Sequence, residues 1–102
     1  MLPTEIFAGY STDGTSITIP LADLPGLTAA EADDATGDGR KVAFELVKTI
    51  AEKYLALPTA DRPAGLSATI GTLQGLSPTT ARRSYSLAFD LDVAAADVIA
   101  LA

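Results

Sequence analysis

The residues of this chain that could do chemistry are carboxylates, amines, guanidiniums and hydroxyls, because its 102 residues include no histidine and no cysteine. Histidine is the commonest general base at neutral pH, and cysteine is the most reactive of the usual nucleophiles. A Ser-His-Asp triad, a Cys-His dyad and an imidazole-rich metal site are therefore excluded. Paired carboxylates can hydrolyse glycosides, but in a deep cleft that so small a chain has little room to form. We predict that the chain is not an enzyme, and we assign no catalytic, cofactor-binding or metal-binding residue.

The lysines are the remaining candidates for a general base. Lys41, Lys48 and Lys53 fall within a predicted helix, and burial would have to depress their pKa before one of them could act. Lysines on helices are mostly solvated, so we expect all three to face water. The Gly37-Asp38-Gly39 segment lacks the lysine of a phosphate-binding loop and does not follow a predicted strand.

One segment has the ligand spacing of a calcium loop. Asp34, Thr36 and Asp38 stand at positions one, three and five, Gly39 at six and Glu45 at twelve, as in an EF-hand. Thr at position three and Lys at position eight depart from that pattern, and the preceding helix is too short. The simpler interpretation is that the aspartates turn the chain and cap the helix that follows. A calcium- or ligand-binding module that uses residues 34–45 is the alternative function.

The arginines outside the long helix suggest protein partners. Arg62, Arg82 and Arg83 lie in predicted loops of a chain whose net charge is −6. Arginine is enriched at protein interfaces because its planar fork pairs with carboxylates. These residues either contact acidic patches of a neighbouring copy or remain solvated. Asp90 and Asp92 alternate with Leu91 and are expected to face solvent.

Charge and hydropathy exclude several classes of protein. Thirteen acidic residues against seven basic ones oppose binding to a phosphate backbone, so we expect no nucleic-acid partner. No apolar run approaches 18 residues and the N-terminus lacks the pattern of a signal peptide, so we expect neither a membrane span nor secretion by that route. A chain without cysteine fits a reducing compartment, and we expect it in the cytoplasm or in a virion.

The first part of the chain predicts a β-hairpin and then a capped turn. Residues 4–10 and 16–21 alternate between apolar and polar, with Asp13-Gly14 between them, which is a strong hairpin signal. Thr28 and Glu31 have the spacing of a capping box that opens one or two helical turns.

A long helix is predicted from about Asp38 to Leu57, and Pro58 ends it. Its polar stripe is narrow, and its apolar residues cover roughly 220° of the circumference, about twice the arc of an ordinary surface helix. The stripe consists of Lys41, Glu45, Lys48 and Glu52. One small sheet cannot cover so wide an arc, so other segments of the chain or another subunit must do so.

A second hairpin follows. Leu66 begins an alternating strand that runs to about Leu73, residues 75–80 form its loop, and Ser84 to Leu91 is the clearest strand of the chain. Residues 94–102 form a short helix or a docking tail. The order ββαββ predicts a single α+β domain over residues 1–102, in which two antiparallel hairpins form one four-stranded sheet beside the long helix.

The Ala- and Thr-rich acidic segment Gly26-Leu27-Thr28-Ala29-Ala30-Glu31-Ala32-Asp33-Asp34-Ala35-Thr36-Gly37-Asp38-Gly39-Arg40-Lys41-Val42 lies in a short chain without Cys, His or Trp. In this composition the chain resembles the small virion proteins of tailed phages, such as capsid decoration or head-completion proteins. The resemblance carries no site residue across. It implies a structural role, and with the wide apolar arc of the helix it favours a self-associating, non-enzymatic module.

Overall fold

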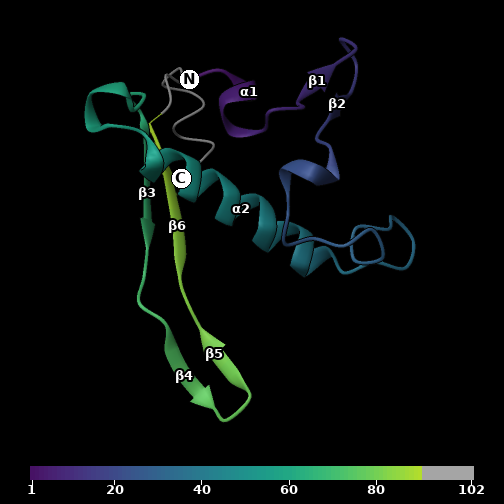
Figure 1. Ribbon diagram of the computed structural model, residues 1–102. Coiled ribbons are helices and arrows are strands. Elements are labelled where there is room, and N and C mark those ends of the chain that lie inside the picture. Colours follow the sequence, from purple (N-terminus) through teal and green to yellow (C-terminus); the bar gives the residue numbers. More distant parts are fainter. Residues whose placement is uncertain (91–102) are drawn as a thin grey trace, which may run out of the picture.

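One long helix with antiparallel hairpins makes up the fold, as the sequence predicts (Figure 1). The computed structural model describes residues 1–90. The helix predicted over residues 94–102 lies outside them. No helix in the described part has the length and hydropathy needed to cross a membrane. The elements are α1 (Pro3–Ile6), β1 (Ser11–Thr12), β2 (Ile17–Thr18), η1 (Leu21–Asp23), α2 (Gly39–Ala56), η2 (Thr59–Asp61), β3 (Leu66–Ile70), β4 (Gln74–Ser77), β5 (Thr80–Arg82) and β6 (Tyr85–Phe89).

The helix α2 confirms the prediction to within a residue or two at each end. Asp38 is its N-cap, and its carboxylate accepts hydrogen bonds from Arg40 N at 3.0 Å and Lys41 N at 3.3 Å. Leu57 is extended at the other end, as the residue before a proline prefers to be.

The first hairpin is shorter than predicted, and its first strand is wrongly placed. Residues 4–10 do not form a strand, because Pro3 at the first helical position and Glu5, which accepts a hydrogen bond from Leu2 N, favour the helical turn α1. The turn at Asp13-Gly14 is confirmed. Asp13 Oδ1 accepts from Thr15 N at 2.8 Å, and Gly14 has a φ of +89°. β1 and β2 pair over only two residues each.

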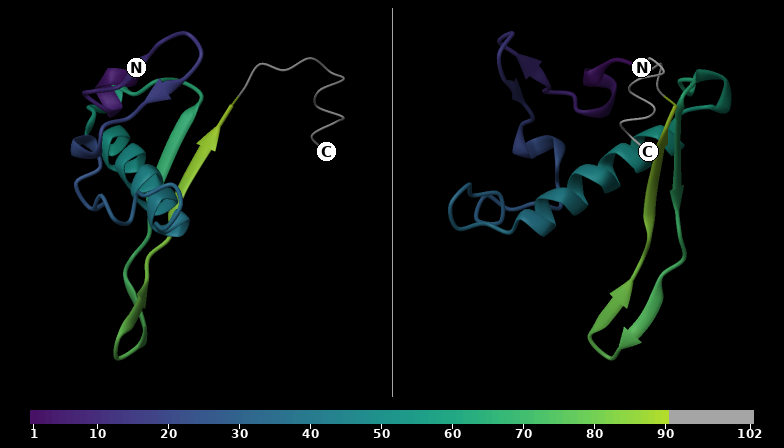
Figure 2. Two further views of the ribbon diagram at one scale, coloured as in Figure 1. Left: turned by 90° about the vertical axis from the view of Figure 1, so that its right-hand side faces the viewer. Right: turned by 180° about the vertical axis from the view of Figure 1, so that it is seen from behind.

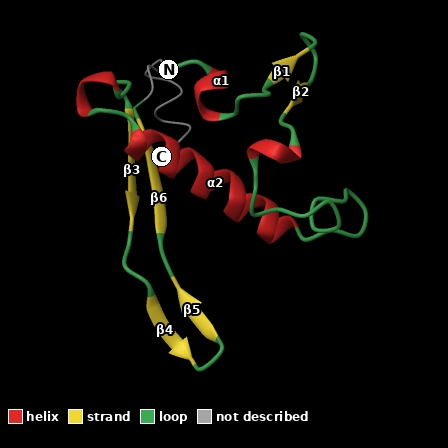
Figure 3. Cartoon of the chain, in the orientation of Figure 1, coloured by secondary structure: helices red, strands yellow, loops and turns green. Residues whose placement is uncertain are grey.

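The predicted four-stranded sheet is also wrong. Residues 1–90 contain three separate two-stranded sheets, β1-β2, β3-β6 and β4-β5 (Figure 3). The order ββαββ is not matched, since α1 precedes the first strand and most of the strands follow α2. The first hairpin is too short to extend a sheet, and it lies away from β3 and β6 in Figure 1 and in the right view of Figure 2.

The second hairpin is longer than predicted. β3 pairs with β6 from Leu66↔Phe89 to Ile70↔Tyr85, and beyond an irregular stretch β4 pairs with β5. Residues predicted as loop therefore continue the two strands as far as Ser77 and Thr80. Leu66, Ala68 and Ile70 alternate with more exposed residues on β3, which packs with β6 on α2.

The core lies between α2 and the N-terminal segment. Phe7, Leu24 and Leu27 form its buried centre. The partly buried residues packed against that centre are Ile6, Tyr10, Ile19, Ala32, Val42, Leu46 and Ile50. The chain thus covers α2 from two sides, with the N-terminal segment on one and β3-β6 on the other. The wide apolar arc is only partly sheltered, since Phe44 is still 40% exposed.

Candidate functional site

The most conspicuous exposed feature is a projecting hairpin, here called the arm (residues 71–84), which contains β4, β5, the turn between them and the residues that flank the two strands. Every residue from Gly71 to Ser84 is exposed. Within residues 1–90 neither strand of the arm packs against any other helix or strand. Figure 2 shows it extending away from α2 and the N-terminal segment. An isolated two-stranded hairpin is only marginally stable in water, so the arm is a surface suited to being covered.

The root of the arm forms a hollow of about 480 Å³, here called the root hollow. It is lined by Phe44, Leu73, Leu76, Ala81, Arg82, Arg83 and Tyr85. Leu73 is 61% exposed and Leu76 52% exposed. The rings of Phe44 and Tyr85 meet edge to face with centroids 5.5 Å apart, which fixes one wall of the hollow. Apolar walls beside two guanidinium groups are the composition of a protein-binding surface.

The three arginines predicted as interface residues divide into two kinds. Arg62 is used inside the fold. Its Nη2 donates to Leu55 O at 3.0 Å and its Nε to Leu57 O at 3.2 Å, and it lies 5.2 Å from the centre of the Tyr54 ring. It therefore binds the carbonyls at the end of α2. Arg82 and Arg83 are exposed at the arm and form no ion pair within residues 1–90.

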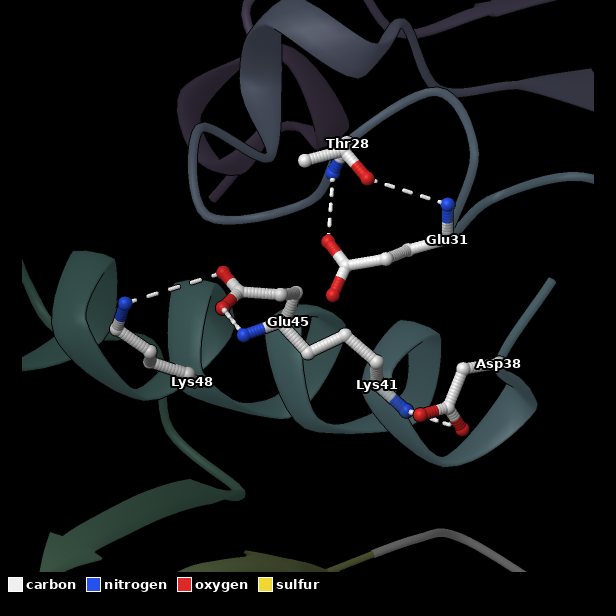
Figure 4. A network of polar contacts seen from close by, with 6 residues as sticks. All are labelled: Thr28, Glu31, Asp38, Lys41, Glu45 and Lys48. Atoms are coloured by element: carbon white, nitrogen blue, oxygen red, sulfur yellow. Dashed lines mark hydrogen bonds and ion pairs between the residues drawn. The ribbon is translucent and has the colours of Figure 1, made fainter.

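Part of the polar stripe of α2 is sheltered from water. Glu45 is 2% exposed, and Lys41 and Lys48, which were expected to face water, are half-buried beside it, whereas Glu52 is exposed. The Glu45 carboxylate lies 3.5 Å from Lys41 Nζ and 3.8 Å from Lys48 Nζ (Figure 4). It packs on Gly26, where no side chain intervenes. Lys53 is exposed as expected.

The calcium-like segment uses its oxygens for local structure. Asp38 caps α2 through Oδ1, and Glu45 faces two lysines from the second turn of the helix. Asp34 is exposed. In the described part of the chain no three acidic side chains gather as a metal site. The structure therefore does not bring Asp34, Asp38 and Glu45 together.

The segment that precedes α2 is a loop built on carboxylates, here called the acidic loop (Thr28–Asp38). Thr28 and Glu31 form the predicted capping box, with Thr28 N donating to Glu31 Oε1 at 2.9 Å and Glu31 N to Thr28 Oγ1 at 3.2 Å (Figure 4). The box closes a turn and not the predicted α-helix. Asp33 Oδ1 accepts from Ala35 N and from the amide and hydroxyl of Thr36.

These hydrogen bonds stabilise the ionised carboxylates of the acidic loop. The amides of Ala35 and Thr36 hold the pKa of Asp33 below its ordinary value of 3.8. The amide and hydroxyl of Thr28 lower the pKa of Glu31 below 4.5. At neutral pH the loop therefore presents negative charges at fixed positions.

Sequence reasoning gave Leu73 and Leu76 no part in a site, because it placed Leu73 at the end of a strand and Leu76 in the loop of residues 75–80. The signal that marks them is the pair of leucines between small polar residues, next to Thr79-Thr80 and Arg82-Arg83. Comparisons of the chain with protein-family models, curated proteins and solved structures find no match.

Proposed function

We propose that the chain is a non-enzymatic structural module that acts as a homo-oligomer. The observation that carries this proposal is the arm, whose leucines are more than half exposed and whose strands pack on no other helix or strand of the described chain. Burying the exposed leucines of the arm against a partner removes apolar surface from water and is therefore favourable.

The overall dimensions support the same proposal. The radius of gyration is 16.3 Å, whereas a compact chain of this length has roughly 13 Å. The exposed area is 7447 Å², whereas a compact monomer of this mass exposes roughly 5,400 Å². Each partner of a standard protein–protein interface contributes roughly 800 Å², so the excess on one chain is enough for two such contacts.

A component of a viral particle, such as a capsid decoration or head protein, is the specific role we propose for such a module. The support for it is the resemblance in composition to small tailed-phage virion proteins, which are structural and assemble in many copies. Genes for capsid and tail proteins beside this one would support the role, and detection of the protein in purified particles would test it directly.

Light scattering on the purified protein tests the oligomer. We expect a mass several times that of one chain at tens of micromolar, and a monomer after Leu73→Ser with Leu76→Ser. Ile17→Ser is the matched control, because Ile17 and Leu73 are both 61% exposed and Ile17 lies outside the arm. A wild-type protein that stays monomeric at hundreds of micromolar would overturn the proposal.

A further inference from the structure

Charge is segregated along this chain. Residues 1–38 contain seven acidic residues and no Lys or Arg. Residues 66–88, which include the arm, contain Arg82 and Arg83 and no Asp or Glu. The acidic loop alone contributes four carboxylates: Glu31, Asp33, Asp34 and Asp38. The exposed cations of the arm and the densest group of anions are thus on different parts of the molecule.

The acidic loop retains oxygens that can accept further hydrogen bonds. All the hydrogen bonds described for Asp33 and Asp38 use Oδ1, which leaves Oδ2 of each carboxylate available. Asp34 takes part in none of these turn hydrogen bonds and is exposed. A guanidinium group needs such outward oxygens, and it binds them best when they are already ordered.

Two cations of the same copy, Arg40 and Lys41, follow this loop directly in the sequence. Lys41 is held at 3.5 Å from Glu45, and Arg40 is exposed in the first turn of α2. No residue of the acidic loop lines the root hollow. In Figures 1 and 2 the arm and the acidic loop extend in different directions from α2. The arm of one copy is therefore available to a second copy.

The small side chains of the acidic loop also suit the root hollow. Ala29, Ala30 and Ala35 are exposed on the acidic loop. Small methyl groups between carboxylates match a hollow with leucine and aromatic walls and two arginines at its edge. Both the charge and the side-chain size of the loop thus complement the arm.

We propose that the arm of one copy docks on the acidic loop of a second copy, with Arg82 and Arg83 bound to the loop carboxylates. This inference rests on the proposed self-association and names its interface. Because the arm and the acidic loop extend in different directions from α2, we expect each copy to bind two different neighbours, and this head-to-tail contact builds a ring or a filament. Because the pairs lie at an exposed rim, added salt weakens the contact.

Two variants test the contact from its two sides. The arm-reversed variant carries Arg82→Glu and Arg83→Glu. The loop-neutral variant carries Asp33→Asn, Asp34→Lys and Asp38→Asn. Asparagine keeps the accepting Oδ1 of Asp33 and is as good an N-cap as aspartate, so the fold should persist. Circular dichroism and thermal unfolding verify this for both variants.

Sedimentation velocity gives the result. We expect each variant alone to be monomeric, with self-association weakened about tenfold or more. Arg82→Lys with Arg83→Lys keeps the charge and should retain part of the association. Lys53→Glu changes an exposed charge on α2 and should retain all of it, in contrast to the single reversal Arg82→Glu.

Mixing the two variants tests whether the arm of one copy binds the acidic loop of another. The loop-neutral variant has an intact arm and the arm-reversed variant has an intact loop, so a mixture should form 1:1 dimers that grow no further. A loop-neutral variant that still self-associates alone would overturn the inference.

The failure of this inference differs from the failure of the proposed function. If wild type and the arm-reversed variant form the same oligomer, the module self-associates through another surface and the arm–loop contact is wrong. If wild type itself is monomeric at hundreds of micromolar, both proposals fail.

Discussion

The carboxylate of Glu45 on α2 lies directly on the backbone of Gly26. A Cβ built on Gly26 would stand 2.6 Å from Glu45 Cδ, closer than real Cβ atoms approach another heavy atom. The missing side chain of one residue thus makes room for the charged group of the other. Lys41 and Lys48 flank this carboxylate and compensate its burial.

Gly26→Ala should lower the free energy of unfolding by about 1–2 kcal/mol, because the new methyl group displaces the Glu45 carboxylate from between its lysines. Urea unfolding measures this change. Gly39→Ala is the control, since nothing lies within 4 Å of a Cβ there. In a Glu45→Ala background the cost of Gly26→Ala should largely vanish. Additive costs of the two substitutions would show that the two residues do not interact.

Arg62→Lys should destabilise the protein by about 1 kcal/mol. A lysine cannot donate to both Leu55 O and Leu57 O in the forked geometry that Arg62 adopts. Thermal unfolding of dilute monomer measures the loss. Arg83→Lys, at an exposed site, should change the midpoint little, and equal effects of the two substitutions would contradict the role assigned to Arg62.

The acidic loop should contribute to acid unfolding. Hydrogen bonds hold the pKa of Asp33 below 3.8 in the folded protein, so below that value the unfolded chain binds more protons. The stabilisation from Asp33 is therefore complete above its ordinary pKa and is lost as the pH falls below 3.8 through the folded value.

Asp33→Asn should reduce the loss of stability below pH 3.8, measured as the free energy of unfolding against pH. Thr36→Val removes one of the hydrogen bonds to Asp33 Oδ1, so it should reduce this loss of stability by a smaller amount. A variant with Asp33→Asn that loses stability as steeply as wild type would refute this assignment.

Calcium at millimolar concentration should leave the thermal midpoint unchanged. Asp38 and Glu45 are engaged with the start of α2 and with two lysines, so binding calcium would require breaking these contacts. A ligand held only by the folded state raises the midpoint by mass action. A rise that Asp34→Asn abolishes would favour the alternative calcium module.

Local signals in the sequence determined the long helix and the turns. Asp38 caps α2 and Pro58 follows its end. Asp13-Gly14 turns the first hairpin, and alternation marks β3 and β6. The hydrogen bonds that stabilise the cap, the turn and the paired strands join residues that are close in sequence or lie on neighbouring strands. The types and spacing of these residues therefore suffice to predict the helix, the turn and the strands.

The tertiary structure alone decided which face of α2 is covered and which strands pair. Lys41 and Lys48 were expected to face water because they are charged, yet the turn at Gly26 packs on Glu45 between them and shelters this part of α2. The hairpins remained apart because β1 and β2 are too short to extend a sheet. The arm projects for a related reason: within residues 1–90 its two strands pack on no other helix or strand, and only its root meets α2, at Phe44. The hydrophobic periodicity of a helix or strand describes that segment alone. Whether its side chains are buried depends on which other segment of the chain packs against it.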